Sequence, residues 1–167
     1  MVLIKKRVNT TEVCRKESQS HKSLSAGLFT MFCPHGICMG FQLMDCVESP
    51  RTPFDILLRR FRKMPGLIIY DNSCKLHLYA LKREPRRFID TRFMVDRMHY
   101  KNHTSCTEGY SMDTYKDIKI EEINSQTNEQ ANAQLRHLST QAAYMTPSNL
   151  IFHVAVFFAI RNMDKNK

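Results

Sequence analysis

Residues 67–77 read LIIYDNSCKLH, and this stretch decides the predicted fold. Its first four residues are a continuous apolar run without polar alternation, which is typical of a strand buried on both faces of a sheet. Asp71 follows at the carboxyl end of that strand, where open α/β sheets bind their ligands. Cys74 and His77 come next, and both residue types bind metals. The stretch therefore predicts an interior strand that ends at a candidate site in an α/β protein.

The residues before this strand predict a β-hairpin and a helix. Residues 28–33 and 37–44 are rich in β-branched, aromatic and thioether side chains, and the sequence Pro-His-Gly between them is typical of a turn. Downstream, Thr52 is predicted to cap a helix whose first position is Pro53. Apolar residues at helical spacing continue to a predicted helix end at residues 65–66.

The residues after the strand predict a largely helical second half. Residues 75–104 are basic and mainly helical in pattern, whereas residues 107–123 form an acidic connector with little periodicity. Residues 128–145 contain good helix formers, and a last helix is predicted to open at the Thr-Pro pair 146–147. The apolar run 150–160 has 11 residues, and about 20 are needed to span a bilayer, so we expect a helix of the core.

Composition limits the functional classes. The chain has 167 residues, which suits one domain with a sizeable core. Its 25 Lys and Arg residues against 16 Asp and Glu give a net charge of +9, which favours a polyanionic partner, nucleic acid ahead of lipid headgroups. The N-terminus lacks the apolar region of a secretory signal, so we expect an intracellular protein. In a reducing compartment its six cysteines are expected to be metal ligands or buried thiols.

Two acids are candidates for a magnesium site. Asp71 ends the predicted central strand, and Glu129 lies on a later predicted helix. Two such carboxylates can hold Mg²⁺ together with substrate phosphates, and paired ions flank a scissile phosphate in two-metal enzymes. The alternative is structural, because the Asp-Asn-Ser sequence is turn chemistry and an acid in the first turn of a helix is favoured by the macrodipole.

Five residues are candidates for a zinc site: Cys74, His77, His99, His103 and Cys106. The first two follow the predicted strand, and the other three have the spacing of one helical face. Zinc takes four thiolate or imidazole ligands in structural sites, so this set would tie two segments together and leave one residue spare. The alternative is that the histidines are exposed and the first cysteine is a buried thiol.

A third candidate is a basic surface that would contact nucleic-acid phosphates. It comprises Arg59, Arg60, Arg62, Lys63, Lys82, Arg83, Arg86 and Arg87. The alternative is a solvated helical face without a partner.

Four segments resemble the ribonuclease H-like catalytic domain of Kyakuja-Dileera-Zisupton transposases, which carry a CxC-type signature. They are LFTMFCPHGICMGF (28–41), LIIYDNSCKLH (67–77), HYKNHTSC (99–106) and INSQTNEQANAQLRHLS (123–139). The likeness covers about residues 27–160 and is strongest to the domesticated transposon copy in the HMG domain-containing protein three family. It implies that Asp71 and Glu129 match the second and last acids of an Asp-Asp-Glu triad that binds two Mg²⁺ ions and cuts and joins DNA. Cys74 and His77 match the family's Cys-x-x-His signature.

The chain departs from that family before the hairpin. The family's first Asp lies on a first strand at the middle of the sheet, but the only acids before this hairpin are Glu12 and Glu17. We therefore predict an incomplete ribonuclease H-like fold at residues 27–162, with the first central strand missing unless residues 1–4 or a partner fill the gap. Residues 1–26 are predicted to be a flexible basic arm, and residues 163–167 a tail.

The resemblance and the missing acid together predict a vestigial catalytic domain. We expect a nuclear, non-catalytic module that binds DNA or nuclear proteins and no membrane, with structural zinc. One alternative is an active Asp-Asp-Glu nuclease or transposase with Mg²⁺, whose missing ligand comes from another segment, such as Glu12, or from another chain. A second alternative is a structural zinc module for protein contacts.

Overall fold

The computed structural model describes residues 2–6, 27–44, 49–103, 106–115, 118–124, 127–142 and 144–165. Within these ranges, strands form one mixed five-stranded sheet in the order β3-β2-β1-β4-β5. The strands are β1 (Val2–Lys6), β2 (Gly27–Phe32), β3 (Cys38–Met44), β4 (Leu67–Tyr70) and β5 (Arg92–Met94). The helices are α1 (Arg51–Arg60), α2 (Ser73–Arg83), α3 (Arg97–Tyr100), α4 (Ile118–Glu121), α5 (Thr127–Leu135), α6 (Ser139–Ala142) and α7 (Pro147–Lys165).

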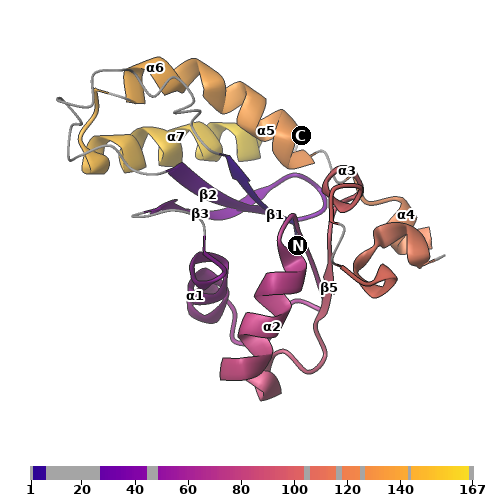
Figure 1. Ribbon diagram of the computed structural model, residues 1–167. Helices are drawn as coiled ribbons and strands as arrows, with labels where there is room; N and C mark the ends of the chain where they lie inside the picture. The colour runs from indigo at the N-terminus through magenta and orange to yellow at the C-terminus, as the bar shows by residue number, and fades with distance from the viewer. Residues whose placement is uncertain are drawn as a thin grey trace, which may run out of the picture.

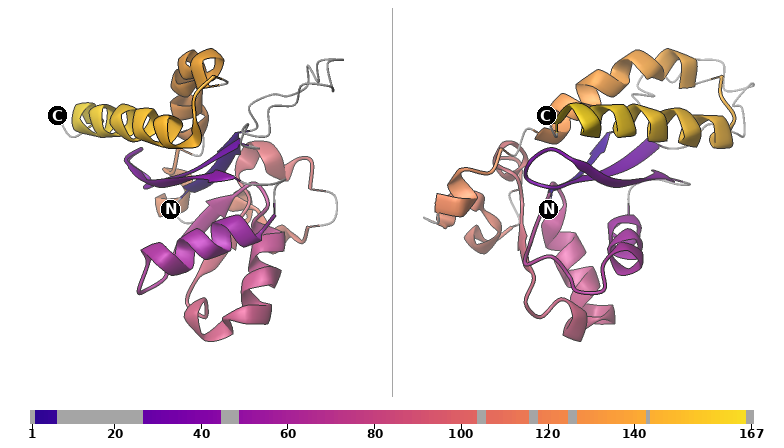
Figure 2. Two further views of the ribbon diagram at one scale, coloured as in Figure 1. Left: turned by 90° about the vertical axis from the view of Figure 1, so that its left-hand side faces the viewer. Right: turned by 180° about the vertical axis from the view of Figure 1, so that it is seen from behind.

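The sheet has helices on both faces (Figure 1). Helices α1 and α2 cover one face, and α5 and α7 cover the other. The prediction of an α/β protein is therefore confirmed, with an antiparallel hairpin, parallel strands and C-terminal helices. Figure 2 shows the same layers from two further sides.

The predicted hairpin is confirmed. Strands β2 and β3 pair antiparallel, and Gly36 in their turn has φ +81°, a conformation that costs glycine little because it has no Cβ. The C-terminal helix holds this turn in place. Arg161 donates to the Gly36 carbonyl oxygen, and the Asn162 amide both accepts from and donates to the backbone of Cys38, at 2.8 and 2.9 Å.

The central strand, which was predicted to be missing unless residues 1–4 or a partner fill the gap, is present. Strand β1 lies in the centre of the sheet, parallel to β4 and antiparallel to β2. Its sequence VLIKK is short, but a strand needs only an extended backbone whose N–H and C=O groups pair with both neighbours. Residues 2–6 of the predicted arm are thus a strand, and residues 7–26 lie outside the described residues.

The LIIY segment is an interior strand, as predicted. β4 lies between β1 and β5 and pairs parallel with both. Strand β5, however, falls inside residues 75–104, which were predicted to be mainly helical. That prediction is wrong for residues 92–94, because a strand of three residues is too short to show an alternating pattern within a basic segment.

Two predicted helix boundaries are also corrected. Helix α1 begins at Arg51 with Pro50 at the N-cap position, so Thr52 lies inside the first turn. The helix ends at Arg60, because Phe61 is extended, well before the predicted end at residues 65–66. The single helix predicted at residues 128–145 is divided, since α5 ends at Leu135 and a 3₁₀ turn separates it from α6.

Alternating residues of β2 divide the core between the two faces of the sheet. Phe29 and Met31 pack in a large cluster with residues of α1 and α2. Phe32 joins a smaller cluster on the opposite face, where its ring lies 5.6 Å from that of Phe158 on α7. This period of two is what a strand buried on both faces requires.

The last helix starts where the sequence predicts. The hydroxyl oxygen of Thr146 accepts from the backbone N–H of Asn149 at 3.4 Å, and α7 begins at Pro147. The prediction that its apolar run is a core helix is only half right. Val154 and Phe158 are buried, but the opposite side of the helix is exposed. Among the helices in the described part of the chain, none has the length and apolar content that crossing a bilayer requires.

Candidate metal centre and basic surface

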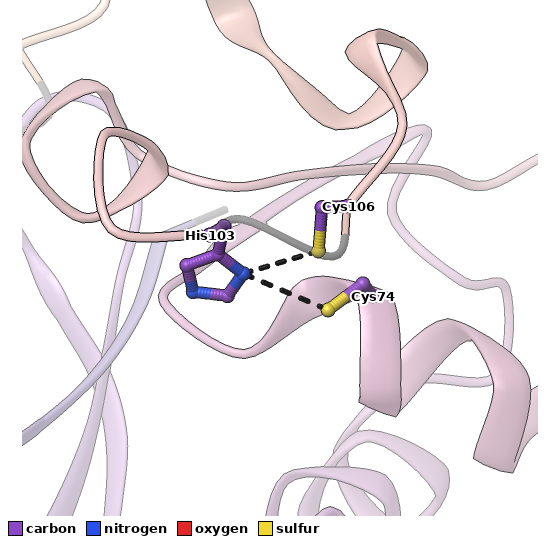
Figure 3. A group of neighbouring side chains, drawn as sticks. All are labelled: Cys74, His103 and Cys106. Atoms are coloured by element: carbon purple, nitrogen blue, oxygen red, sulfur yellow. Dashed lines mark hydrogen bonds between the residues drawn. The ribbon is translucent and has the colours of Figure 1, made fainter.

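Three predicted zinc ligands come together beside the sheet. The Nδ1 atom of His103 lies 3.1 Å from the sulfur of Cys106 and 3.8 Å from the sulfur of Cys74 (Figure 3). All three ligand atoms lie within 4.8 Å of one another, and the three residues are partly buried. This Cys-His-Cys group could hold a metal ion.

The fold brings these residues from two separate segments. Cys74 lies in the first turn of α2, directly after β4. His103 follows the short helix α3, whose N-cap Asp96 is buried and accepts from the backbone N–H groups of Met98 and His99 at 2.9 and 3.1 Å. Such a cap satisfies the orphan donors of a helix N-terminus and so fixes the direction in which the chain leaves β5.

The distances within the group are compatible with a metal ion such as zinc. Zinc–sulfur bonds of about 2.3 Å and zinc–nitrogen bonds of about 2.0 Å at tetrahedral angles place sulfur and nitrogen about 3.5 Å apart. The two distances from His103 lie on either side of that value. Thiolate and imidazole are also the ligand types that zinc prefers. The donor set and spacing are therefore compatible with this metal.

Burial raises the pKa of the Cys106 thiol to about 11, and the nearby Cys74 adds to the effect. The pKa of Tyr110 is also raised, first by burial and then by the same two thiols. Burial thus favours the neutral form of the Cys106 thiol. A metal ion bound here would replace the proton of that thiol, because thiolate is the form that binds metal.

The two other predicted zinc ligands lie outside this group. The Nδ1 atom of His77 lies 2.8 Å from the hydroxyl of Tyr110, and its ring stacks on Phe93 at 4.7 Å. Burial lowers the pKa of His77, which favours the neutral ring. The Nδ1 atom of His99 lies 2.5 Å from a carboxylate oxygen of Asp96. The five candidates thus divide into three that come together and two that have other partners.

The predicted magnesium ligands lie on different elements. Asp71 follows β4 at its carboxyl end, and Glu129 is exposed in the first turn of α5. Among the described residues, the Cys-His-Cys group is the only cluster of three or more possible metal ligands, so no third acid gathers with these two. The magnesium site stays a prediction.

The predicted basic residues lie at the C-terminal ends of α1 and α2. They occupy the last turn of each helix and the segments that follow, and all are exposed. Arg87 donates to the carbonyl oxygen of Phe61 at 2.7 Å, which joins the two segments. The guanidinium of Arg83 lies 3.5 Å from the ring centre of Tyr79. Arg87 thus links the ends of the two helices, and we call the eight exposed cations together the basic end.

Sequence reasoning missed Tyr110 and Asp96. Tyr110 connects His77 to the two thiols, and both Tyr110 and His77 line an open cavity of about 450 Å³. Asp96 precedes a helix of four residues, so the only available signal was a capping residue in front of a very short helix. No local sequence pattern indicated Tyr110, because the segment that contains it is placed by an isolated bridge between Val95 and Ser111.

Comparison with models of protein families, with curated proteins and with solved structures gives no match. The fold and the site define a small α/β domain with a Cys-His-Cys group that could bind a metal ion. Its function is therefore argued from the geometry.

Proposed function

We propose that this chain is a transposase-derived, ribonuclease H-like domain that binds nucleic acid, or a nuclear protein, in the nucleus and has lost the ability to cut DNA. The observation that carries the proposal is the sequence of the central strand. β1 reads VLIKK and supplies no carboxylate beside Asp71.

The strand order supports the ribonuclease H-like part of the proposal. In the family that the sequence resembles, the first strand lies at the middle of the sheet and carries the first catalytic Asp. Here β1 occupies the middle position, between the hairpin and β4. The register pairs Leu3 with Tyr70, so the next step along the two parallel strands brings Ile4 beside Asp71. Position 4 is therefore where the missing acid would be expected.

The missing carboxylate supports loss of catalysis. A two-metal site holds its ions through converging carboxylates and contributes several kcal/mol of charge stabilisation to the transition state. Each 1.36 kcal/mol changes the rate tenfold, so removing one of three acids lowers the rate by orders of magnitude. Residues 5 and 6 of the same strand are lysines, which do not bind magnesium.

The basic end supports nucleic-acid binding. Helix α2 has 11 residues, so about 16 Å separates the basic end from Asp71 at the start of the helix. Phosphates bound at the basic end would therefore lie away from the former catalytic position. Such an arrangement favours binding without cleavage.

The test measures binding and cleavage in one sample. The purified chain is incubated with labelled duplex, nicked or hairpin DNA and with Mg²⁺ or Mn²⁺. We expect DNA binding that weakens steadily with salt, and no cleavage products. Cleavage that depends on the metal and disappears in Asp71→Asn would overturn the loss of catalysis. Absence of salt-dependent binding would overturn the nucleic-acid function and favour a protein partner.

The Cys-His-Cys group favours a second function, a structural zinc module. The three ligands join the start of α2 to the segment after α3, so the metal would hold the two together. Three protein ligands leave one position for His77 or for solvent. His77 follows Cys74 by three residues on the same helix face and would reach the ion by turning away from Tyr110.

Metal analysis tests this second function. Protein purified without chelator should contain about one zinc per chain, and the zinc should be lost in His103→Ala. His99→Ala is the matched control and should keep its zinc, because His99 faces Asp96. Cobalt substitution identifies the fourth ligand, since the absorption bands change in His77→Ala only if His77 binds the ion. Protein that contains no zinc would overturn the module.

A further inference from the structure

Helix α7 has an apolar outer face. Figures 1 and 2 show this helix on the outside of the molecule, across the sheet from α1 and α2. Its inner side packs on the hairpin through Val154 and Phe158, which are 2% and 3% exposed. Seven apolar residues on its other side are exposed, and they form what we call the α7 stripe: Ile151, Phe152, Ala155, Val156, Ala159, Ile160 and Met163.

The α7 stripe differs from the other exposed apolar residues of the described chain. Its largest members are highly exposed, with Phe152 at 65%, Ile160 at 57% and Met163 at 69%. They recur at the spacing of one helix face, so they form one continuous surface. Elsewhere in the described residues, large exposed apolar side chains occur at most in pairs on one element, such as Leu78 and Leu81 on α2. Single exposed apolar residues are ordinary, but a contiguous patch indicates an interaction surface.

The geometry points to a second copy of this chain as the occupant of the α7 stripe. The exposed fractions correspond to roughly 600 Å² of surface per copy, or about 1,200 Å² when two stripes pack together, which is the lower limit for a specific dimer. A two-fold axis lets one patch serve both copies. The two small residues Ala155 and Ala159 near the middle of the stripe let two helices approach closely.

Other occupants fit the α7 stripe less well. The longest segment outside the described residues, 7–26, contains only three large apolar residues, Val8, Val13 and Leu24, so it lacks a matching apolar face. A membrane surface would require basic residues beside the apolar face. Arg161 is instead directed inward, where it donates to Gly36 in the hairpin turn and to Gln134 on α5.

The inference is independent of the proposed nucleic-acid function, because the basic end lies on the other face of the sheet. In a dimer built on α7, the two basic ends would lie on opposite outer sides and could each contact a separate nucleic-acid segment. The net charge of +9 on each copy opposes association, so dimerisation should strengthen as salt increases.

Sedimentation equilibrium over a range of protein concentrations tests the dimer. The wild-type chain should show a monomer–dimer equilibrium, and Ile160→Glu should weaken it at least tenfold. Leu78→Glu is the matched control, because Leu78 is also 57% exposed and lies on α2, on the other face of the sheet. A monomer at every concentration, or equal weakening by both variants, would overturn the proposal.

Cross-linking keeps the test valid if a glutamate on α7 disturbs folding. Ala159→Cys should form a cross-linked dimer with a short bifunctional maleimide, in excess of the wild-type background from its six cysteines. Leu78→Cys should not exceed that background. Sedimentation with phosphatidylcholine–phosphatidylserine vesicles completes the design. Vesicle binding that Ile160→Glu abolishes, in a chain that stays monomeric, would assign the stripe to a membrane surface instead.

Discussion

The two ends of helix α2 carry opposite chemistry. Asp71 precedes the helix, and Cys74 in its first turn belongs to the Cys-His-Cys group, which could bind a metal ion. At its other end, Lys82 and Arg83 begin the basic end, which suits phosphates. In an active two-metal nuclease, cations and phosphates must meet at one place. Their separation along one helix is consistent with the proposed loss of cutting.

The largest effect should follow loss of the proposed zinc ion from the Cys-His-Cys group at the start of α2. With free zinc at about a thousand times its dissociation constant, binding adds about 4 kcal/mol to the free energy of unfolding. Cys106→Ser, or treatment with a chelator, should therefore lower the Tm by roughly 8–16 °C. Thermal denaturation followed by circular dichroism measures this change.

The matched control for that loss is Cys33→Ser. Cys33 is also partly buried, but it lies in the hairpin turn, where its sulfur lies 3.9 Å from the Nδ1 atom of His35. In Cys33→Ser, chelator should lower the Tm by the same amount as in the wild type. If Cys106→Ser and the wild type melt at the same temperature with zinc present, the Cys-His-Cys group holds no structural ion.

The next effect concerns the basic end. Removing two phosphate contacts with Arg62→Ala and Arg86→Ala should cost about 2 kcal/mol, or roughly 30-fold in DNA affinity. The slope of log affinity against log salt should fall by about two. Fluorescence anisotropy at several salt concentrations gives both values. Arg83 and Arg87 are left intact, because they contact Tyr79 and Phe61 and their loss could disturb the fold.

The control for the basic end removes the same charge elsewhere. Arg51 and Lys101 are both exposed, and Arg51 at the start of α1 already pairs with Asp55 at 3.3 Å. Arg51→Ala with Lys101→Ala should therefore change the affinity only slightly. Equal losses in the two double variants would mean that net charge, and not the basic end, determines binding.

A smaller effect concerns the pKa of the Cys38 thiol. This thiol is compared with that of Cys106, whose pKa is also raised by a neighbouring thiol. Burial raises its pKa from 9.0 to about 11, so the fold favours the neutral thiol. Its contribution to stability is fully present below pH 9 and is lost as the pH rises toward 11. Because this side chain is only partly buried, we expect a loss on the order of 1 kcal/mol.

Urea denaturation at pH 8 and pH 11 measures that loss. The difference in unfolding free energy between the two pH values should be smaller in Cys38→Ala than in the wild type. Lysines and tyrosines titrate equally in both proteins, so the comparison isolates this thiol. An identical pH dependence of stability in the two proteins would contradict the raised pKa of Cys38.

The sequence predicted the parts of the fold that depend on local pattern. The turn between β2 and β3, the apolar run of β4 and the Thr-Pro start of α7 are all present. The errors concern elements that depend on tertiary context. β1 and β5 are too short for periodicity, and each becomes a strand because β4 offers it a pairing partner.

The site was predictable in composition but not in arrangement. Metal-binding residue types identified five candidates, yet only a fold can decide that His103 meets both thiols. The aromatic partners Phe93 and Tyr110 divert His77, and the capping residue Asp96 diverts His99. Packing and capping, which spacing does not reveal, thus separate the ligands from their neighbours.

The smallest effect is expected for Asp71→Asn on DNA affinity. This substitution tests directly whether the two ends of α2 act separately. Asp71→Asn removes a negative charge about 16 Å from the basic end, beyond the screening length of about 8 Å at physiological salt. DNA affinity and its salt slope should therefore stay within about twofold of the wild type, with or without Mg²⁺. If Mg²⁺ strengthens DNA binding in the wild type and the variant loses this effect, Asp71 still holds a cation against the phosphates. The two ends of the helix would then belong to one working site.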